Sequence, residues 1–212
     1  MIHYIYADAL DAFPVLKRTM FEDRADQFKK RLDWEVTVDD AGQERDEYDA
    51  MNPMYIIWKG ADGTHGGSMR VLPTVGQCMT NDHFVHLAGG VRIESPLVWE
   101  CTRFCLSPRH TNQAAEIAGS LMLAGCQMGL RFGLDSSVGV FDPRMVRIYR
   151  RIGWEPEVLG TDGEGRDRIS LGLWDINETA RNEMCERLGI DTAVPDTWLD
   201  ASFPVTEELL AA

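Results

Sequence analysis

Residues 97–106 read "LVWECTRFCL" and form the most informative apolar segment of the sequence. Its aromatic and aliphatic residues predict a central strand, yet the segment contains Glu100 and Arg103, and charged residues are rare in such strands. Because the two are three positions apart, a regular strand would direct them to opposite faces of the sheet. A β-bulge in the strand from Trp99 to Leu106 would bring both to one face and free a backbone N–H to polarise a carbonyl group. We therefore predict a bulged strand with a chemical role.

The segments on either side of this strand alternate between strand and helix patterns. Helix signals are clearest at 143–153, because Asp142 can cap the first turn, Pro143 suits the first helical position and Gly153 suits the end. A sheet with helices on both faces is the simplest packing, so we predict an α/β fold: a single-domain, three-layer αβα sandwich with a mixed, twisted sheet. The expected strands are 2–6, 54–60, 66–73, 97–106, 136–141, 155–159 and 168–174, and the expected helices are 13–32, 112–132, 143–153 and 178–188.

Length and composition exclude several classes of protein. The 212 residues suffice for one domain with a large core, and no apolar run approaches the ~18 to 20 residues of a membrane span. A net charge of -13 disfavours nucleic acid as a partner. The amino terminus has no signal-peptide pattern, so we expect a cytoplasmic location. Five scattered cysteines fit reduced, buried thiols, and no zinc pattern accompanies them.

Charged side chains interrupt two other apolar patterns. Arg24 lies in the middle of the apolar arc of helix 13–32, and Arg70 lies inside strand 66–73. A buried arginine requires a carboxylate partner, because an unpaired buried charge is strongly destabilising. We therefore expect a paired network, which serves either stability or a ligand site, of Arg24, Arg70 and Arg103 with Asp46, Asp49 and Glu100.

The acidic segment 44–53, "ERDEYDAMNP", narrows the possible ligands. It lacks the spacing of a calcium-binding loop and has no nearby histidine ligands, so a metal is not expected. Glu44 and Glu47 are expected to be solvated. Arg24 keeps two interpretations: a structural ion pair, or one wall of a ligand site shared with Phe28, one helical turn away.

These residues together resemble the acyl-homoserine lactone synthases, the LuxI-type autoinducer synthase family. The matching positions occur in order and at the family's spacing over roughly residues 20–110, whereas the second half of the chain resembles the family mainly in the order of its elements. The matching residues are Arg24, Phe28, Trp34, Asp46, Asp49, Arg70, Phe84, Glu100 and Arg103.

The resemblance implies a fold similar to that of the GCN5-related N-acetyltransferases and a quorum-sensing function. The implied substrates are S-adenosylmethionine and an acyl thioester, usually on acyl carrier protein, and no cofactor or metal is implied. Residues 1–110 would bind adenosylmethionine, 111–190 would hold the acyl chain and the carrier, and 191–212 would form a peripheral tail. The resemblance assigns catalytic roles to Glu100, Arg70, Asp46 and Asp49, and adenosylmethionine binding to Arg24, Phe28, Trp34, Arg103 and Phe84.

The second half of the chain gives weaker expectations for the acyl donor. Segment 109–116, "RHTNQAAE", lacks the glycines that cradle a pyrophosphate, so a phosphopantetheine arm is favoured over coenzyme A. Family members selecting 3-oxo chains often place a threonine on the strand that matches 136–141, "SSVGVF"; its absence favours a medium or long unsubstituted chain. Candidate residues for the acyl pocket, which core packing alone would also explain, are Leu121, Met122, Met128, Val138 and Val140.

Four arginines on helix 143–153 reverse the charge of the chain locally, at Arg144, Arg147, Arg150 and Arg151. They form either a solvated helix face or a docking site for acidic acyl carrier protein. Two other functions remain open: an N-acyltransferase of the same fold that acts on another amine without lactone formation, and a non-catalytic sensor of acyl ligands.

Overall fold

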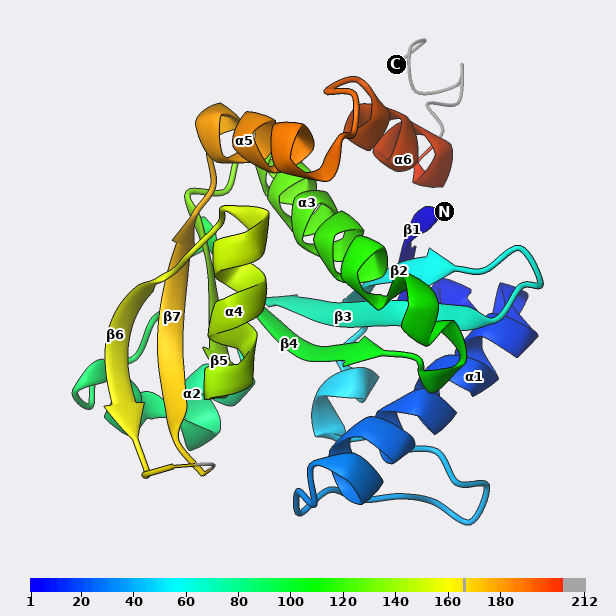
Figure 1. The fold of residues 1–212 in the computed structure, drawn as a ribbon. Helices are drawn as coiled ribbons and strands as arrows, with labels where there is room; N and C mark the ends of the chain where they lie inside the picture. The colour runs from blue at the N-terminus through cyan, green and yellow to red at the C-terminus, as the bar shows by residue number, and fades with distance from the viewer. Residues whose placement is uncertain (166, 204–212) are drawn as a thin grey trace, which may run out of the picture.

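The computed structural model describes residues 1–165 and 167–203, and within them seven strands form a single sheet (Figure 1). The strand order is β1-β2-β3-β4-β5-β7-β6, and every neighbouring pair is antiparallel except β4 and β5. The strands are β1 (Ile2–Tyr6), β2 (Met54–Lys59), β3 (His65–Pro73), β4 (Val98–Leu106), β5 (Ser136–Phe141), β6 (Glu157–Asp162) and β7 (Ile169–Asp175).

Helices cover both faces of the sheet, which confirms the predicted α/β fold. Helix α3 crosses the strands on one face together with α4, α5 and α6, whereas α1 and α2 lie on the other face (Figure 1). As predicted, Asp142 caps α4 by accepting a hydrogen bond from Arg144 N, and Gly153 ends it in a left-handed conformation. The helices are α1 (Pro14–Arg24), α2 (Met79–His83), α3 (Ala114–Phe132), α4 (Pro143–Ile152), α5 (Glu178–Leu188) and α6 (Val194–Ser202).

The predicted bulge in β4 is confirmed at Arg103. Ser68 of β3 pairs with Cys105 and Arg70 pairs with Thr102, so Met69 alone faces two residues of β4. Arg103 absorbs the extra residue in a left-handed backbone conformation with φ of 53°. A non-glycine residue rarely adopts this conformation, and it is found mainly where the surrounding structure fixes it.

The parallel strands β4 and β5 pair only at their beginnings. Their register runs from Val98 opposite Ser136 to Glu100 opposite Val138 and then stops. At the next position Gly139 still lies close to β4, because a Cβ there would lie 2.8 Å from the carbonyl oxygen of Cys101, but no ladder pairing continues beyond it. The sheet therefore opens into a gap beside the bulge.

Three features differ from the sequence prediction. The expected helix 13–32 is α-helical only to Arg24 and continues as a π-helical segment, η2 (Ala25–Arg31). Neither α2 nor α6 was predicted; in α6, Leu199 is buried and Ser202 Oγ accepts a hydrogen bond of 3.1 Å from Tyr4 N. Residues 204–212 of the expected peripheral tail lie outside the described residues.

No helix in the described part of the chain is long and apolar enough to cross a membrane.

Candidate active site

A cavity of about 160 Å³ occupies the gap between β4 and β5 and is lined from both faces of the sheet. The face that carries α1 and α2 contributes Phe28, Trp34, Met79 and Phe84, with Glu100, Thr102 and Arg103 from β4. The face that carries α3 and α4 contributes mainly apolar groups, among them Met122, Met128, Tyr149 and Trp174. One end of the cavity is therefore polar and the other is apolar.

The predicted network of buried charges lies behind the polar end. Arg24, which is 1% exposed, donates from Nη1 and Nη2 to Asp49 at 2.9 Å each, and from Nε to Glu44 at 2.6 Å. Arg24 is not among the residues that line the cavity. The structure thus favours the ion-pair interpretation of Arg24 over a direct contact with a ligand.

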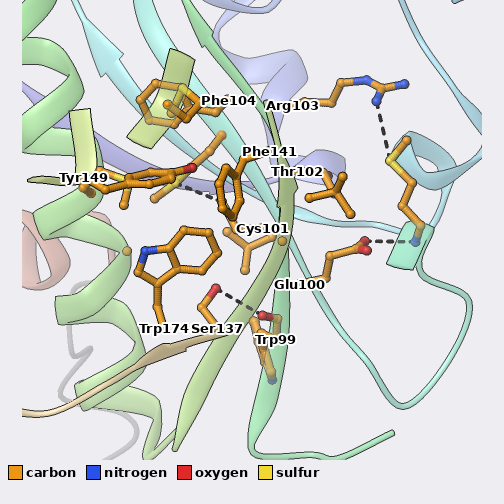
Figure 2. A pocket seen from close by; sticks show the side chains of 18 of the residues that line it. Trp99, Glu100, Cys101, Thr102, Arg103, Phe104, Ser137, Phe141, Tyr149 and Trp174 are labelled. Atoms are coloured by element: carbon orange, nitrogen blue, oxygen red, sulfur yellow. Dashed lines mark hydrogen bonds between the residues drawn. The ribbon is translucent and has the colours of Figure 1, made fainter. Parts of the chain in front are cut away.

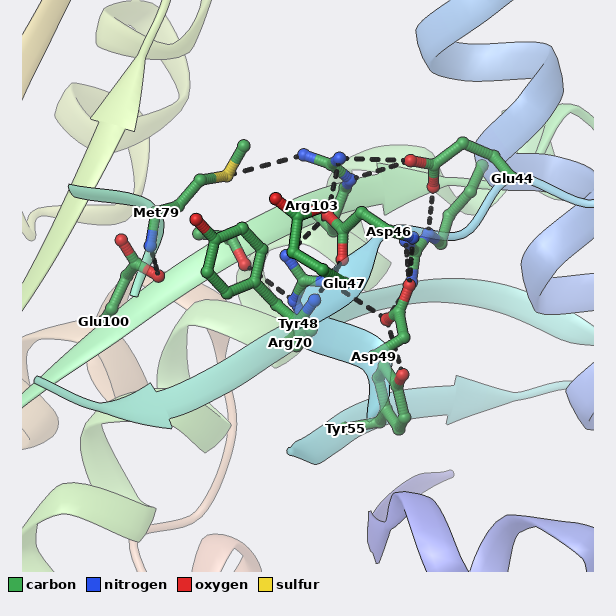
Figure 3. Close-up of polar contacts among 12 residues, drawn as sticks. Glu44, Asp46, Glu47, Tyr48, Asp49, Tyr55, Arg70, Met79, Glu100 and Arg103 are labelled. Carbon is green, nitrogen blue, oxygen red and sulfur yellow. Dashed lines mark hydrogen bonds and ion pairs between the residues drawn. The ribbon is translucent and has the colours of Figure 1, made fainter. Parts of the chain in front are cut away.

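Arg70 and Arg103 contact these two carboxylates and a third one, Asp46 (Figure 3). Arg70 pairs with both oxygens of Asp46, donates to Asp49 Oδ1 at 2.9 Å, and donates from Nε to Thr102 Oγ1 at 3.1 Å. Arg103 Nη2 lies 2.7 Å from Asp46 Oδ2 and 3.1 Å from an oxygen of Glu44. Three arginines and three carboxylates thus fix the bulge of β4 to the acidic loop.

Two predictions about this network were wrong. Glu44 is not solvated: its side chain is 0% exposed and lies between Arg24 and Arg103. Glu100 does not belong to the network and forms a separate contact, so Glu44 takes its expected place. Glu47 is 62% exposed, as predicted for a solvated residue.

The charge state of Asp49 follows from these contacts. Burial opposes its ionisation, but Arg24 and Arg70, together with a 2.6 Å hydrogen bond from the hydroxyl of Tyr55, hold its pKa well below the usual range. Burial, with the carboxylate of Asp49 next, raises the pKa of Tyr55, so its hydroxyl stays protonated and can donate. Asp49 is therefore an anion that organises the site.

Glu100 faces the cavity from β4 and is 1% exposed. Its carboxylate accepts a hydrogen bond of 3.0 Å from Met79 N and a second one from Thr80 N, at the start of α2. Burial raises its pKa, although these N–H groups favour the ionised form. A buried carboxylate with a raised pKa beside a cavity is suited to accept a proton.

Aromatic and sulfur groups complete the polar end of the cavity. The rings of Phe28 and Trp34 stack with a centroid separation of 5.2 Å and an interplanar angle of 16°. The guanidinium carbon of Arg103 lies 5.4 Å from the centroid of Phe28, and Arg103 Nη1 lies 3.6 Å from the sulfur of Met79. Figure 2 shows Glu100, Thr102 and Arg103 on the same side of β4, as the bulge predicts.

The predicted acyl-pocket residues divide into two groups. Met122, Met128 and Val140 line the cavity, whereas Leu121 and Val138 are fully buried and are not among its lining residues. Core packing accounts for these last two. The four arginines of the predicted docking face are all exposed on α4, where Arg144 pairs with Asp142 at 2.9 Å and Arg150 with Glu155 at 3.2 Å.

Sequence reasoning missed three residues of the site: Glu44, Met79 and Tyr149. Glu44 is one of several acidic residues in its loop, so nothing in the sequence separates it from solvated neighbours. Met79 follows an irregular segment and begins a helix of five residues, which is too short to leave a periodic pattern. Tyr149 could have been suspected as a polar group on the apolar side of helix 143–153.

A second polar cluster lies between α1 and β3. His65 Nδ1 is 2.7 Å from Asp23 Oδ2, and His65 Nε2 is 2.9 Å from Ser68 Oγ. A histidine between an aspartate and a serine is also the arrangement of the catalytic triad of serine hydrolases. Ser68 is only 2% exposed and does not line the cavity, so a substrate cannot reach it. We interpret this cluster as structural.

Comparison with known proteins identifies the family. The autoinducer synthase family model matches residues 14–184. The acyl-homoserine-lactone synthase of Rhizobium etli is 38% identical over 180 residues, which cover 83% of this chain and 84% of that protein.

Two solved structures share the fold at a TM-score of 0.79. The CoA-dependent acyl-homoserine lactone synthase MesI is 22% identical, with coverage of 90% of this chain and 96% of that one. BjaI, solved with SAM and isopentyl-CoA, is 21% identical, with coverage of 93% and 99%. The family match over most of the sequence, with the Rhizobium etli relative, shows that this chain belongs to the LuxI-type acyl-homoserine lactone synthases, as the resemblance predicted.

Proposed function

We propose that this chain transfers an acyl group from a thioester to the amine of S-adenosylmethionine and then closes the homoserine lactone, releasing methylthioadenosine. The observation that carries this proposal is the cavity through the split sheet. It joins a polar end, which contains the buried carboxylate of Glu100, to an apolar end suited to an acyl chain. The product would serve as a quorum-sensing signal.

The polar end suits the chemistry of adenosylmethionine. The stacked rings of Phe28 and Trp34 offer faces for a sulfonium cation or an adenine ring, and Phe84 adds a third aromatic group. Arg103 lies beside them. Its Nε and Nη2 contact carboxylates, whereas Nη1 contacts no carboxylate among residues 1–165 and 167–203. We assign Arg103 to the substrate carboxylate.

The first step joins the amine nitrogen to the thioester carbonyl carbon and breaks the carbon–sulfur bond, so the thiol leaves. Attack requires a neutral amine, and a free α-amino group has a pKa of roughly 8, so a modest base suffices. Glu100 takes that proton, directly or through water. A backbone N–H at the bulge of β4 would stabilise the oxyanion.

The second step closes the ring without an acid or base. A carboxylate oxygen of the acylated substrate attacks the γ carbon, and the carbon–sulfur bond electrons leave with methylthioadenosine. The positive sulfur is already a good leaving group, so the step depends on placement. Arg70, Asp46 and Asp49 act here as positioning residues, because they hold Thr102 and Arg103 in place. No cofactor is needed for either step.

We further propose acyl carrier protein as the donor. The exposed arginines of α4 offer a basic face to an acidic carrier, and electrostatic steering would raise the rate of encounter. The coenzyme A dependence stated for MesI makes acyl-CoA the alternative donor. Five free cysteines support the expected cytoplasmic location.

Mass spectrometry of extracts from cells that express the chain tests the proposal. The wild-type chain should yield an acyl-homoserine lactone that is absent from cells expressing Glu100→Gln. An N-acylated amine without lactone would favour the alternative N-acyltransferase. Failure to detect either product, with the protein folded and abundant, would favour the acyl-ligand sensor and overturn the proposal.

A further inference from the structure

The hydroxyl of Tyr149 projects into the apolar end of the cavity without a hydrogen-bond partner. Tyr149 lies on α4, is 5% exposed and lines the cavity. Among residues 1–165 and 167–203, no group forms a hydrogen bond with its hydroxyl, whereas three other buried tyrosines have partners. Tyr4 donates to Ala124 O, Tyr48 to Asp82 and Tyr55 to Asp49.

Two other hydroxyl groups of the cavity already have a partner, although Thr102 only accepts and lies with Arg70 at the polar end of the cavity. Ser137 Oγ donates to Trp99 O at 3.2 Å, and Thr102 Oγ1 accepts from Arg70 at 3.1 Å. Tyrosine hydroxyls inside a protein usually have a protein partner, whereas that of Tyr149 has only the space of the cavity it lines. The hydroxyl of Tyr149 is therefore available to a ligand.

Aromatic packing fixes the direction of this hydroxyl. The ring of Tyr149 meets Phe141 edge to face at 5.3 Å and 87°, and Trp174 at 5.1 Å and 76°. Figure 2 shows the side chain of Tyr149 extending from α4 toward the sheet and ending beside the ring of Phe141. Burial raises the pKa of Tyr149 well above its ordinary value, so the group is protonated and can both donate and accept.

We infer that the cavity selects acyl chains that carry a hydroxyl or keto oxygen near the thioester, with Tyr149 as the group that binds this oxygen. The inference rests on the proposed function. Tyr149 and Cys101 both line the cavity, and Cys101 directly follows Glu100 in β4, so the oxygen would lie within the first few carbons of the chain, as at C3. The sequence favoured an unsubstituted chain because "SSVGVF" lacks threonine, but here α4 supplies the hydroxyl instead of β5.

Matched substrates test this selectivity. The test compares three eight-carbon thioesters: octanoyl, 3-hydroxyoctanoyl and 3-oxooctanoyl. The three corresponding twelve-carbon thioesters are included, and each acyl group is supplied both on acyl carrier protein and on coenzyme A. Turnover is measured as release of methylthioadenosine. Three proteins are measured: wild type, Tyr149→Phe, which keeps the ring, and Tyr4→Phe, which removes a buried hydroxyl outside the cavity. Wild type should prefer a 3-hydroxy or 3-oxo chain. Tyr149→Phe should lower kcat/KM for that chain about tenfold or more and leave the unsubstituted chain within about twofold. Tyr4→Phe should keep the wild-type preference.

Two results would overturn the inference: a wild-type preference for the unsubstituted chain at both lengths, or a preference that survives in Tyr149→Phe. If no thioester releases methylthioadenosine, the proposed function fails first. Calorimetric binding of 3-hydroxyoctanoic and octanoic acids then decides the inference separately. Tighter binding of the hydroxy acid by wild type, lost in Tyr149→Phe, supports the subsite, and equal binding of both acids by both proteins refutes it.

Discussion

Glu100 and Arg103 reach the same side of β4 and meet at one residue, Met79. Glu100 accepts a hydrogen bond from the backbone N–H of Met79, and Arg103 Nη1 lies 3.6 Å from its sulfur. A regular strand would separate two residues at this spacing, so the left-handed backbone of Arg103 creates the contact. The bulge thus places a candidate base and a candidate carboxylate-binding group beside one cavity.

Replacing the carboxylate of Glu100 tests its proposed role as the base. Glu100→Gln should lower kcat by about 100-fold or more, because proton transfer by a positioned group contributes about 10² to 10⁴ in rate. Methylthioadenosine release measures the effect. Glu94→Gln, at an exposed carboxylate in the segment before β4, serves as the control and should keep wild-type turnover. Wild-type turnover in a folded Glu100→Gln protein would refute the role.

The raised pKa of Glu100 also predicts a pH-dependent stability. The folded protein binds this proton more tightly than the unfolded chain does. The resulting stabilisation is complete at pH values below the pKa that the carboxyl group has in the unfolded chain. It is lost as the pH rises through the pKa that the group has in the folded protein. The Glu100→Gln variant has no carboxyl group at this position, so it does not lose stability in this way as the pH rises. Urea unfolding from about pH 4 to neutrality should therefore show the variant gaining stability relative to wild type as pH rises. A stability difference that stays constant across this range would contradict the raised pKa.

Glu44 and Glu47 form a matched pair for testing the buried network. Glu44 is 0% exposed and contacts Arg24 and Arg103, whereas Glu47 is 62% exposed in the same loop. Glu44→Gln should lower the free energy of unfolding by about 3 kcal/mol, because it leaves buried guanidinium groups undercompensated. Glu47→Gln should change it by less than about 0.5 kcal/mol. Equal effects of the two substitutions in urea titrations would show that the network contributes no such stability.

Charge reversal on α4 tests carrier docking. The double variant Arg147→Glu/Arg150→Glu should raise KM for acyl carrier protein substrates about tenfold or more, and clearly more than it raises KM for acyl-CoA, because the acidic surface of the carrier spans more of this face than the phosphates of coenzyme A. Arg18→Glu/Lys30→Glu, at exposed cations of α1 and η2, is the control. An unchanged KM for the carrier substrate, or an equal rise in the control, would exclude docking on this face.

The sequence was sufficient to predict the sheet with its flanking helices and the bulge of β4, because each leaves a local signal. Alternating apolar residues marked the strands, and two charges at an unusual spacing marked the bulge. The same reasoning could not place Glu44, whose burial depends on where Arg103 points after the bulge. It also missed the hydroxyl of Tyr149, because its position depends on how α4 packs over the split sheet, which no local pattern encodes.

The most direct test of the proposed reaction is the ratio of its products. Purified protein is supplied with S-adenosylmethionine and an acyl thioester that it turns over, and methylthioadenosine, acyl-homoserine lactone and free thiol are quantified in the same sample. Acyl transfer followed by lactonisation predicts equal molar amounts of all three. Thiol release with an N-acyl product, but without methylthioadenosine or lactone, would contradict the account and show an N-acyltransferase instead.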